Sequence, residues 1–114
     1  MKARRTHPRA WTQIDPAAWP TSENQPIAVI ALDPEDLRRE YGIEFKDDHD
    51  DLDSMRLAVL RLPSGSVVGL ARYMSAPDPG TGVYAEGDAE PDTVLREIRQ
   101  VFELPARAVS WSRS

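Results

Sequence analysis

Two apolar runs joined by a short turn decide the fold of this chain. The first run is Met55-Arg-Leu-Ala-Val-Leu-Arg-Leu62, the connection is Pro63-Ser-Gly-Ser66, and the second run is Val67-Val-Gly-Leu-Ala-Arg-Tyr-Met74. A proline that presets the first central turn position and a glycine that accepts a positive φ angle are typical of a β-hairpin connection. We therefore predict a hairpin that is closed by a type I turn and a glycine bulge.

The predicted turn fixes which residues of the two strands face each other. A three-residue loop places Arg56 opposite Arg72 and leaves Gly69 within the second strand. Like charges that face each other across a sheet are unfavourable, so we expect either internal acidic partners or an external anion, such as a phosphate or a carboxylate. The candidate internal partners are Asp51, Asp53 and Glu40. The glycine predicts a bulge or a close approach to the backbone.

Three other segments have the character of strands. Ile27–Leu32 is an apolar run of strand length, Thr81–Glu86 follows the hairpin closely, and Ala108–Trp111 lies near the end of the chain. Sequential strands joined by short connections usually pair with their neighbours. Together with the hairpin, these segments predict an antiparallel sheet of four to five strands.

Two helices are predicted from their start and stop signals. Asp33 at a cap position, Pro34 at the first helical position and the terminating Gly42 delimit a short helix over residues 34–41. Apolar residues at helical spacing predict a main amphipathic helix over about 91–102. The expected fold class is α+β, with the main helix packed on one face of the sheet and the short helix at an edge.

The chain is long enough for one domain. Its 114 residues can form a single modest core, and we expect one α+β domain over residues 26–114. Residues 1–25 lack periodicity, so we interpret them as an irregular, basic N-terminal arm. Trp11 and Trp19 in this arm are costly to expose, which favours packing against the open edge of the core or against a partner.

Charge divides the chain into an acidic body and a basic arm. The net charge is −5, yet residues 1–9 contain four basic residues and no acid, which leaves −9 on the remainder. Such a body repels nucleic acid and attracts basic partners, while the arm alone makes only weak, salt-sensitive phosphate contacts. The absence of cysteine and of a long apolar run leads us to expect a soluble cytoplasmic protein without membrane contact.

The most unusual segment is Lys46–Asp53, in which five of the seven residues from 47 to 53 are aspartate. Aspartate is disfavoured within strands and helix interiors, so we predict an acidic loop that leads into the hairpin. The residues of this loop that could bind a basic protein surface are Asp47, Asp48, His49, Asp50, Asp51 and Asp53. A loop that is only solvated is the alternative.

No motif in the chain indicates catalysis, a metal or a cofactor. Calcium-loop spacing starting from Asp47 or Asp48 fails, because neither register has a glycine at the sixth position and an acid at the twelfth. His49 has no second histidine nearby for a transition metal. There is no cysteine nucleophile, no nucleophile-elbow motif and no phosphate-binding glycine spacing. We therefore expect no enzyme activity, no cofactor and no metal.

These observations favour a small acidic protein-interaction domain that docks a basic partner through the Asp-rich loop. Bacterial immunity or antitoxin-type inhibitors, which block a basic toxin site, provide an analogy that rests on size, charge and the lack of catalytic motifs. Two alternatives remain open. One is a nucleic-acid accessory protein that uses the basic arm, and the other is a binder of a small anionic ligand at Arg56 and Arg72.

Overall fold

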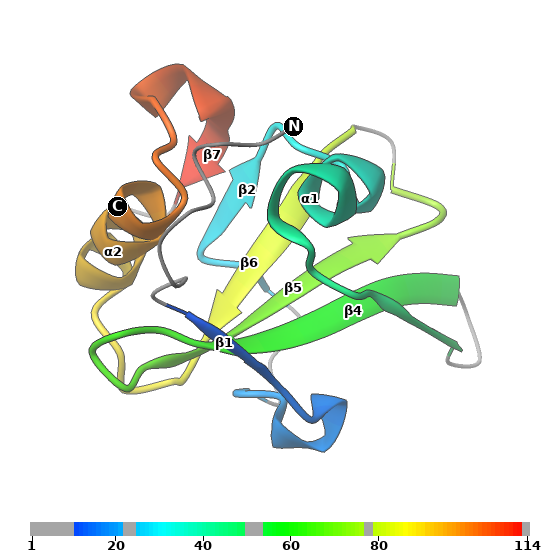
Figure 1. Ribbon diagram of the computed structural model, residues 1–114, viewed down its shortest axis with the longest axis horizontal. Coiled ribbons are helices and arrows are strands. Elements are labelled where there is room, and N and C mark those ends of the chain that lie inside the picture. The colour runs from blue at the N-terminus through cyan, green and yellow to red at the C-terminus, as the bar shows by residue number, and fades with distance from the viewer. Residues whose placement is uncertain (1–10, 22–24, 50–53, 77–78, 113–114) are drawn as a thin grey trace.

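A computed structural model describes residues 11–21, 25–49, 54–76 and 79–112. Within these ranges the chain forms an antiparallel sheet with two α-helices, which confirms the α+β class (Figure 1). The strands are β1 (Thr12–Ile14), β2 (Ala28–Ile30), β3 (Lys46–His49), β4 (Ser54–Arg61), β5 (Val67–Tyr73), β6 (Thr81–Ala85) and β7 (Val109–Ser112). The helices are α1 (Pro34–Tyr41) and α2 (Pro91–Val101), with short 3-10 turns at η2 (Pro16–Ala18) and η3 (Ala106–Ala108).

The described part of the sheet has seven strands, so the prediction of four to five strands was wrong. The strand order is β1-β4-β5-β6-β2-β7, and β3 lies beside β4 on the same edge as β1. Strand β1 pairs with Val59–Arg61 and strand β3 pairs with Ser54–Leu57, so the two short strands follow one another along β4. Both were missed because short edge strands depend on backbone pairing and need no alternation of apolar and polar residues.

The hairpin that joins β4 to β5 has the predicted turn. The backbone N–H of Gly65 donates to the carbonyl of Leu62 at 2.8 Å, and the N–H of Leu62 donates to the carbonyl of Ser66 at 2.8 Å. Gly65 has a φ of 96°, which a residue with a side chain rarely adopts. The resulting register places Arg56 opposite Arg72, as predicted.

Both helices lie where the sequence predicted them. Helix α1 begins at Pro34, where the carboxylate of Asp36 accepts a hydrogen bond from the backbone N–H of Asp33 at 3.0 Å. It ends at Gly42, which has a φ of 77° and donates its N–H to the carbonyl of Arg38. Helix α2 ends at Val101, one residue before the predicted end.

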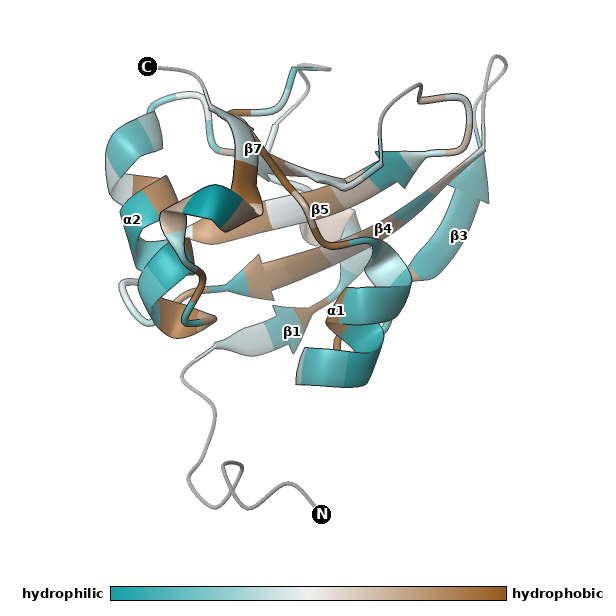
Figure 2. Cartoon of the chain, turned by 90° about the horizontal axis from the view of Figure 1, so that it is seen from above, coloured by the Kyte–Doolittle hydropathy of each residue, from teal (hydrophilic) through white to brown (hydrophobic). Residues whose placement is uncertain are grey.

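The core lies between the two helices and one face of the sheet, which we call the helix face. Figure 2 shows α1 and α2 on the same side of the strands. Leu37 of α1 and Ile98 of α2 are buried against alternate strand residues. The strand residues of this core include Ala58, Leu60, Val68, Leu70, Val83, Ala85, Ala28 and Ile30. Alternation of side chains along each strand places the intervening residues on the opposite face, which we call the open face.

Trp11 closes the end of the helix face. Its side chain is 4% exposed, and its ring centroid lies 5.6 Å from that of Phe102. Tyr41 packs edge-on against the same phenylalanine at 4.8 Å, and its hydroxyl donates to the Phe102 carbonyl at 2.9 Å. The chain continues from this aromatic cluster into β1, so the irregular structure expected for residues 1–25 does not hold at Thr12–Ile14.

Trp19 lies on the open face, on the other side of the sheet from Trp11. Its ring packs against the backbone of Gly69 and lies 5.2 Å from the ring of Tyr84. The close approach that the glycine predicted is therefore made by a tryptophan side chain. Both tryptophans pack on the folded chain, as one of the two interpretations expected, and they hold the segment from Trp11 to Trp19 around the edge of β4.

A side chain at position 69 should displace Trp19. A Cβ atom on Gly69 would lie 2.5 Å from Cζ3 of Trp19, whereas a Cβ on Gly87 would meet nothing within 4 Å. We expect Gly69→Ala to lower the free energy of unfolding by about 1–3 kcal/mol because overpacking forces the ring away. Gly87→Ala is the matched control and should change it by less than about 0.5 kcal/mol. Urea denaturation measures both, and equal stability of the two variants would contradict the contact.

Candidate functional site

The acidic segment is partly a strand. Asp47, Asp48 and His49 belong to β3 and are exposed, whereas Asp50, Asp51 and Asp53 lie outside the described residues. The predicted loop was therefore wrong for Lys46–His49. An edge strand that is solvated on its outer side tolerates aspartate because its carboxylates stay in water while the backbone pairs with β4. Figure 2 shows β3 as a uniformly hydrophilic strand beside β4.

The register of β3 sends its charges to both faces of the sheet. Lys46 lies opposite Leu57 and Asp48 lies opposite Met55, so this pair of charged residues shares the open face. Asp47 lies opposite Arg56 on the helix face, and its Oδ1 is 3.4 Å from Nε of that arginine. The Asp47 side chain is 84% exposed, so the ion pair leaves most of its carboxylate in solvent.

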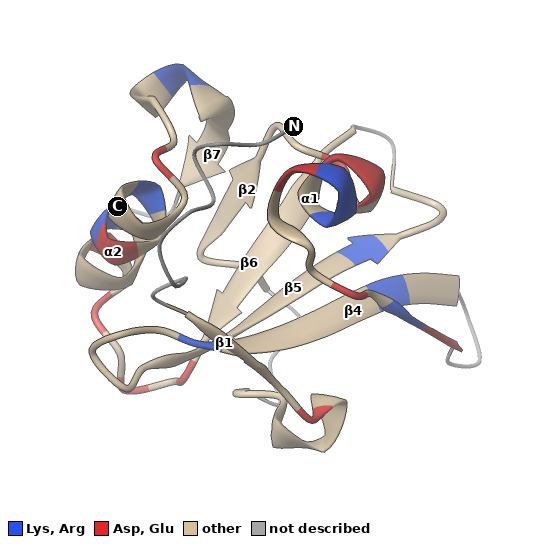
Figure 3. Cartoon of the chain, in the orientation of Figure 1, with Lys and Arg blue, Asp and Glu red and all other residues tan. Residues whose placement is uncertain are grey.

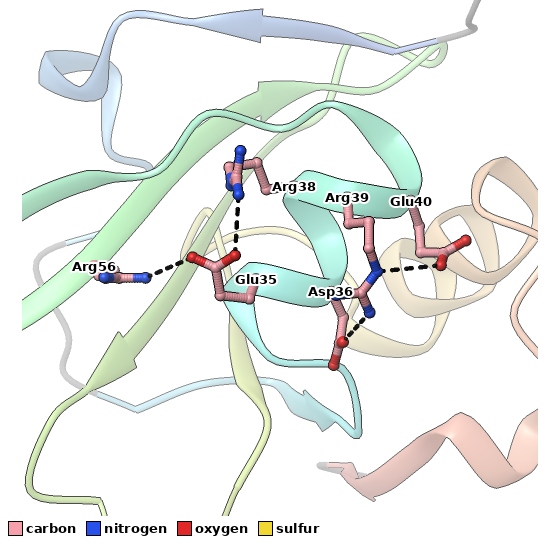
Figure 4. A network of polar contacts seen from close by, with 6 residues as sticks. All are labelled: Glu35, Asp36, Arg38, Arg39, Glu40 and Arg56. Carbon is pink, nitrogen blue, oxygen red and sulfur yellow. Dashed lines mark hydrogen bonds and ion pairs between the residues drawn. The ribbon is translucent and has the colours of Figure 1, made fainter.

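Arg56 and Arg72 have partners within the chain. Arg56 contacts Glu35 of α1 at 3.4 Å in addition to Asp47, as Figure 4 shows for the α1 side. Arg72 donates from Nη1 to the carbonyl of Gly80 at 2.9 Å. Within the described residues Arg56 thus contacts the acids Glu35 and Asp47, whereas Glu40, one of the predicted partners, pairs with Arg39. The other predicted partners, Asp51 and Asp53, lie outside the described residues. An external anion is not required to explain the two facing arginines.

Helix α1 carries a row of exposed ion pairs beside these arginines. Arg38 lies 3.1 Å from Glu35, and Arg39 lies 2.6 Å from Asp36 and 3.8 Å from Glu40. The hydrogen bond from Arg38 lowers the pKa of Glu35, with smaller contributions from Arg56. The pKa of Asp36 is lowered mainly by the backbone N–H of Asp33 and then by Arg39. Figure 3 shows the resulting mixture of acidic and basic residues on α1.

Acid should weaken the start of α1. A carboxylate whose pKa is lowered on folding stabilises the protein above its unfolded pKa, and this stabilisation is lost as the pH falls through the lower folded value. For Asp36 the loss begins near the ordinary value of 3.8 and continues below it. We expect Asp36→Asn to be less stable than the parent chain at neutral pH and the difference to shrink as the pH falls below 3.8.

The measurement for this prediction is the urea midpoint of the two proteins as a function of pH. Asp92→Asn is the control, because Asp92 is an exposed acid in the first turn of α2. A gap between Asp36→Asn and the parent chain that stays constant down to the acid limit would contradict the assigned contacts.

Two adjoining cavities lie on the open face. The smaller one has a volume of about 410 Å³ and is lined by Asp15, Pro16, Ala17, Trp19, Lys46, Asp48, Met55, Leu57, Tyr73 and Tyr84. The larger one has a volume of about 710 Å³ and is lined by Pro26, Val29, Ala31, Ala71, Arg72, Tyr73, Ala76, Pro79, Gly80, Gly82, Tyr84, Ser110 and Trp111. Tyr73 and Tyr84 line both cavities, so the two adjoin on the open face, and together we call them the open-face groove.

Sequence reasoning missed this groove, although part of its floor was predictable. The hairpin register places Met55 opposite Tyr73 and Leu57 opposite Ala71 on one face. The walls come from Trp19 and Trp111, which the sequence does not place relative to the hairpin. Burial raises the pKa of Tyr84, with a smaller contribution from Tyr73, and only 5% of the Tyr84 surface is exposed.

The described residues contain no group of three potential metal ligands among His, Cys, Asp and Glu side chains. No helix in the same ranges is long and apolar enough to cross a membrane. Comparison with protein-family models, curated proteins and solved structures found no match. Function must therefore be inferred from the surface of the chain itself.

Proposed function

We propose that this chain is a small acidic protein-interaction domain that binds a basic surface of a protein partner along the β3 edge. The observation that carries the proposal is the exposure of all four residues of β3, which pairs with β4 on one side and, in the described part of the chain, with no strand on the other. An unpaired strand edge offers backbone hydrogen-bonding groups to another chain. The carboxylates of Asp47 and Asp48 favour a basic partner.

The proposal keeps the analogy with immunity or antitoxin-type inhibitors, which act by covering a basic site on another protein. A short acidic strand suits such a role because charge attraction accelerates association and strand pairing fixes the orientation. The Arg56 and Arg72 alternative has less support, since Glu35 and Asp47 already lie within 3.4 Å of Arg56. The basic arm of residues 1–9, on which the nucleic-acid alternative depends, lies outside the described residues.

The test is capture of a partner from an extract of the source cells, followed by binding measurements with the purified partner. The variant is Asp47→Asn with Asp48→Asn, and the control is Glu86→Gln with Asp88→Asn, which alters two exposed acids outside β3. Removing two interfacial charges of about 0.2–1 kcal/mol each should weaken binding by about twofold to thirtyfold. The control should bind like the parent chain.

The partner should also have a basic surface, and its affinity should fall as salt is raised. Equal capture by the β3 variant and the parent chain would contradict the proposal, as would capture of a partner whose binding is insensitive to salt.

A further inference from the structure

Neither α-helix covers the open face of the sheet. Its groove runs from Trp19 across Tyr73 and Tyr84 to Trp111, and it is therefore bordered by aromatic rings along its length. Trp111 is 49% exposed, which is unusual for so large an apolar side chain. Trp19 and Tyr73 are half-buried and Tyr84 is buried at 5% exposure, so the accessible rings are those of Trp19, Tyr73 and Trp111. Accessible aromatic residues around a concave surface mark sites where another molecule can bind.

The smaller cavity has the chemistry of a site for a long basic side chain. The rings of Trp19 and Tyr84 meet at 5.2 Å with a tilt of 49°, and Tyr73 lines the same cavity. Aromatic faces attract ammonium and guanidinium groups, while the alkyl stem of a lysine or arginine packs on apolar residues. Asp15 and Asp48 also line the cavity, against one basic residue, Lys46. The balance of charge thus favours a cation.

The larger cavity has the chemistry of a site for apolar side chains. Its lining includes Ala71 and Gly82, which pair on neighbouring strands, and Val29 and Trp111. Tyr73 and Tyr84 line both cavities, so the larger cavity adjoins the smaller one. One extended segment can therefore occupy both. Side chains on one face of an extended segment recur every second residue, which suits two adjoining cavities.

The charges argue against a nucleic acid as the occupant. Aromatic side chains on a sheet can stack bases, but single-strand binding also requires a positively charged groove along the phosphates. Here the smaller cavity carries two acids and one lysine, and the whole chain has a net charge of −5. The acidic strand β3 borders the same cavity through Lys46 and Asp48. Phosphates would be repelled from this end of the groove.

We infer that the open-face groove binds an extended segment of the protein partner, with a lysine or arginine side chain in the smaller cavity and an apolar side chain in the larger. The inference rests on the proposed function and names the part of the surface that recognises the partner. Trp19 and Tyr73 contact the alkyl stem of the basic residue, and Asp15 and Asp48 attract its charge.

The experiment uses the full chain labelled with ¹⁵N and, as the probe, a short capped peptide in which an arginine and a valine are two residues apart and separated by serine, so that both side chains lie on one face of the extended peptide. We expect saturable shifts of the Trp19 indole N–H and of the amides of Tyr73 and Tyr84. Asp15→Asn should weaken binding about threefold, because the amide oxygen can still cap η2 at the N–H of Ala17 while the charge is lost. Asp88→Asn, outside both cavities, should leave the affinity unchanged.

Three outcomes would overturn the inference: no saturable shift in the groove, equal shifts with the matching valine and glutamate peptide, or shifts of the groove residues by a single-stranded oligonucleotide. Shifts confined to β3, with Trp19, Tyr73 and Tyr84 unaffected, would also overturn it while leaving the β3 edge as the binding site. Asp15 lies outside β3, so its effect separates the groove from the edge. If Asp47→Asn with Asp48→Asn left partner binding unchanged while Asp15→Asn still weakened peptide binding, the proposed function would be contradicted and the groove would not.

Discussion

The contact between the Trp19 ring and the backbone of Gly69 determines how the rest of this small protein is arranged. Two helices of 8 and 11 residues cover only one face of the sheet. The other face has to be covered by the chain that precedes them, and Trp19 supplies a large apolar ring at the centre of β5. Only a glycine lets the ring approach so closely. In the described residues neither α-helix covers this face, and it retains the two cavities beside Trp19 and Trp111.

The two faces of the sheet therefore differ in how they are covered. The helix face is closed by Leu37, Ile98 and the aromatic cluster around Phe102, and it provides the stability of the domain. Burial of these apolar side chains contributes about 1.5–3 kcal/mol each before the entropy of folding is subtracted. The open face is divided by Tyr73 and Tyr84 into two cavities, one of which meets the acidic strand β3. Affinity for a partner can therefore change on this face without disturbing the core.

The exposed ion pairs of α1, Asp47 and Arg56 stabilise the fold only weakly. Pairs such as Arg56 with Asp47 are largely in solvent, where ion pairs are screened and ordering long side chains is costly. The same exposure makes the β3 carboxylates accessible to a partner. The β3 carboxylates destabilise this strand only slightly, because its backbone is hydrogen-bonded to β4.

Local signals in the sequence predicted the elements that depend on local chemistry. Pro63 and Gly65 fixed the hairpin and its register, and Asp33, Pro34 and Gly42 fixed the bounds of α1. Strands β1 and β3 were not predictable in this way, since their pairing with β4 is a long-range property and β3 consists of residues that disfavour strands. The acidic residues of the candidate site were identified, but their placement on two faces required the register. The hairpin register predicted part of the groove's floor, but the groove itself could not be found, because nothing local relates Trp19 to Gly69 or Tyr84.

Proton contacts of the Trp19 indole ring are the direct test of its packing on Gly69. If the ring packs there, strong nuclear Overhauser effects are expected from the Hζ3 and Hη2 protons of Trp19 to the Hα protons of Gly69, together with effects to the ring of Tyr84. Absence of these effects, with an indole ring that is fully exposed or that contacts the helix face, would contradict both the position of the N-terminal segment and the groove that it forms.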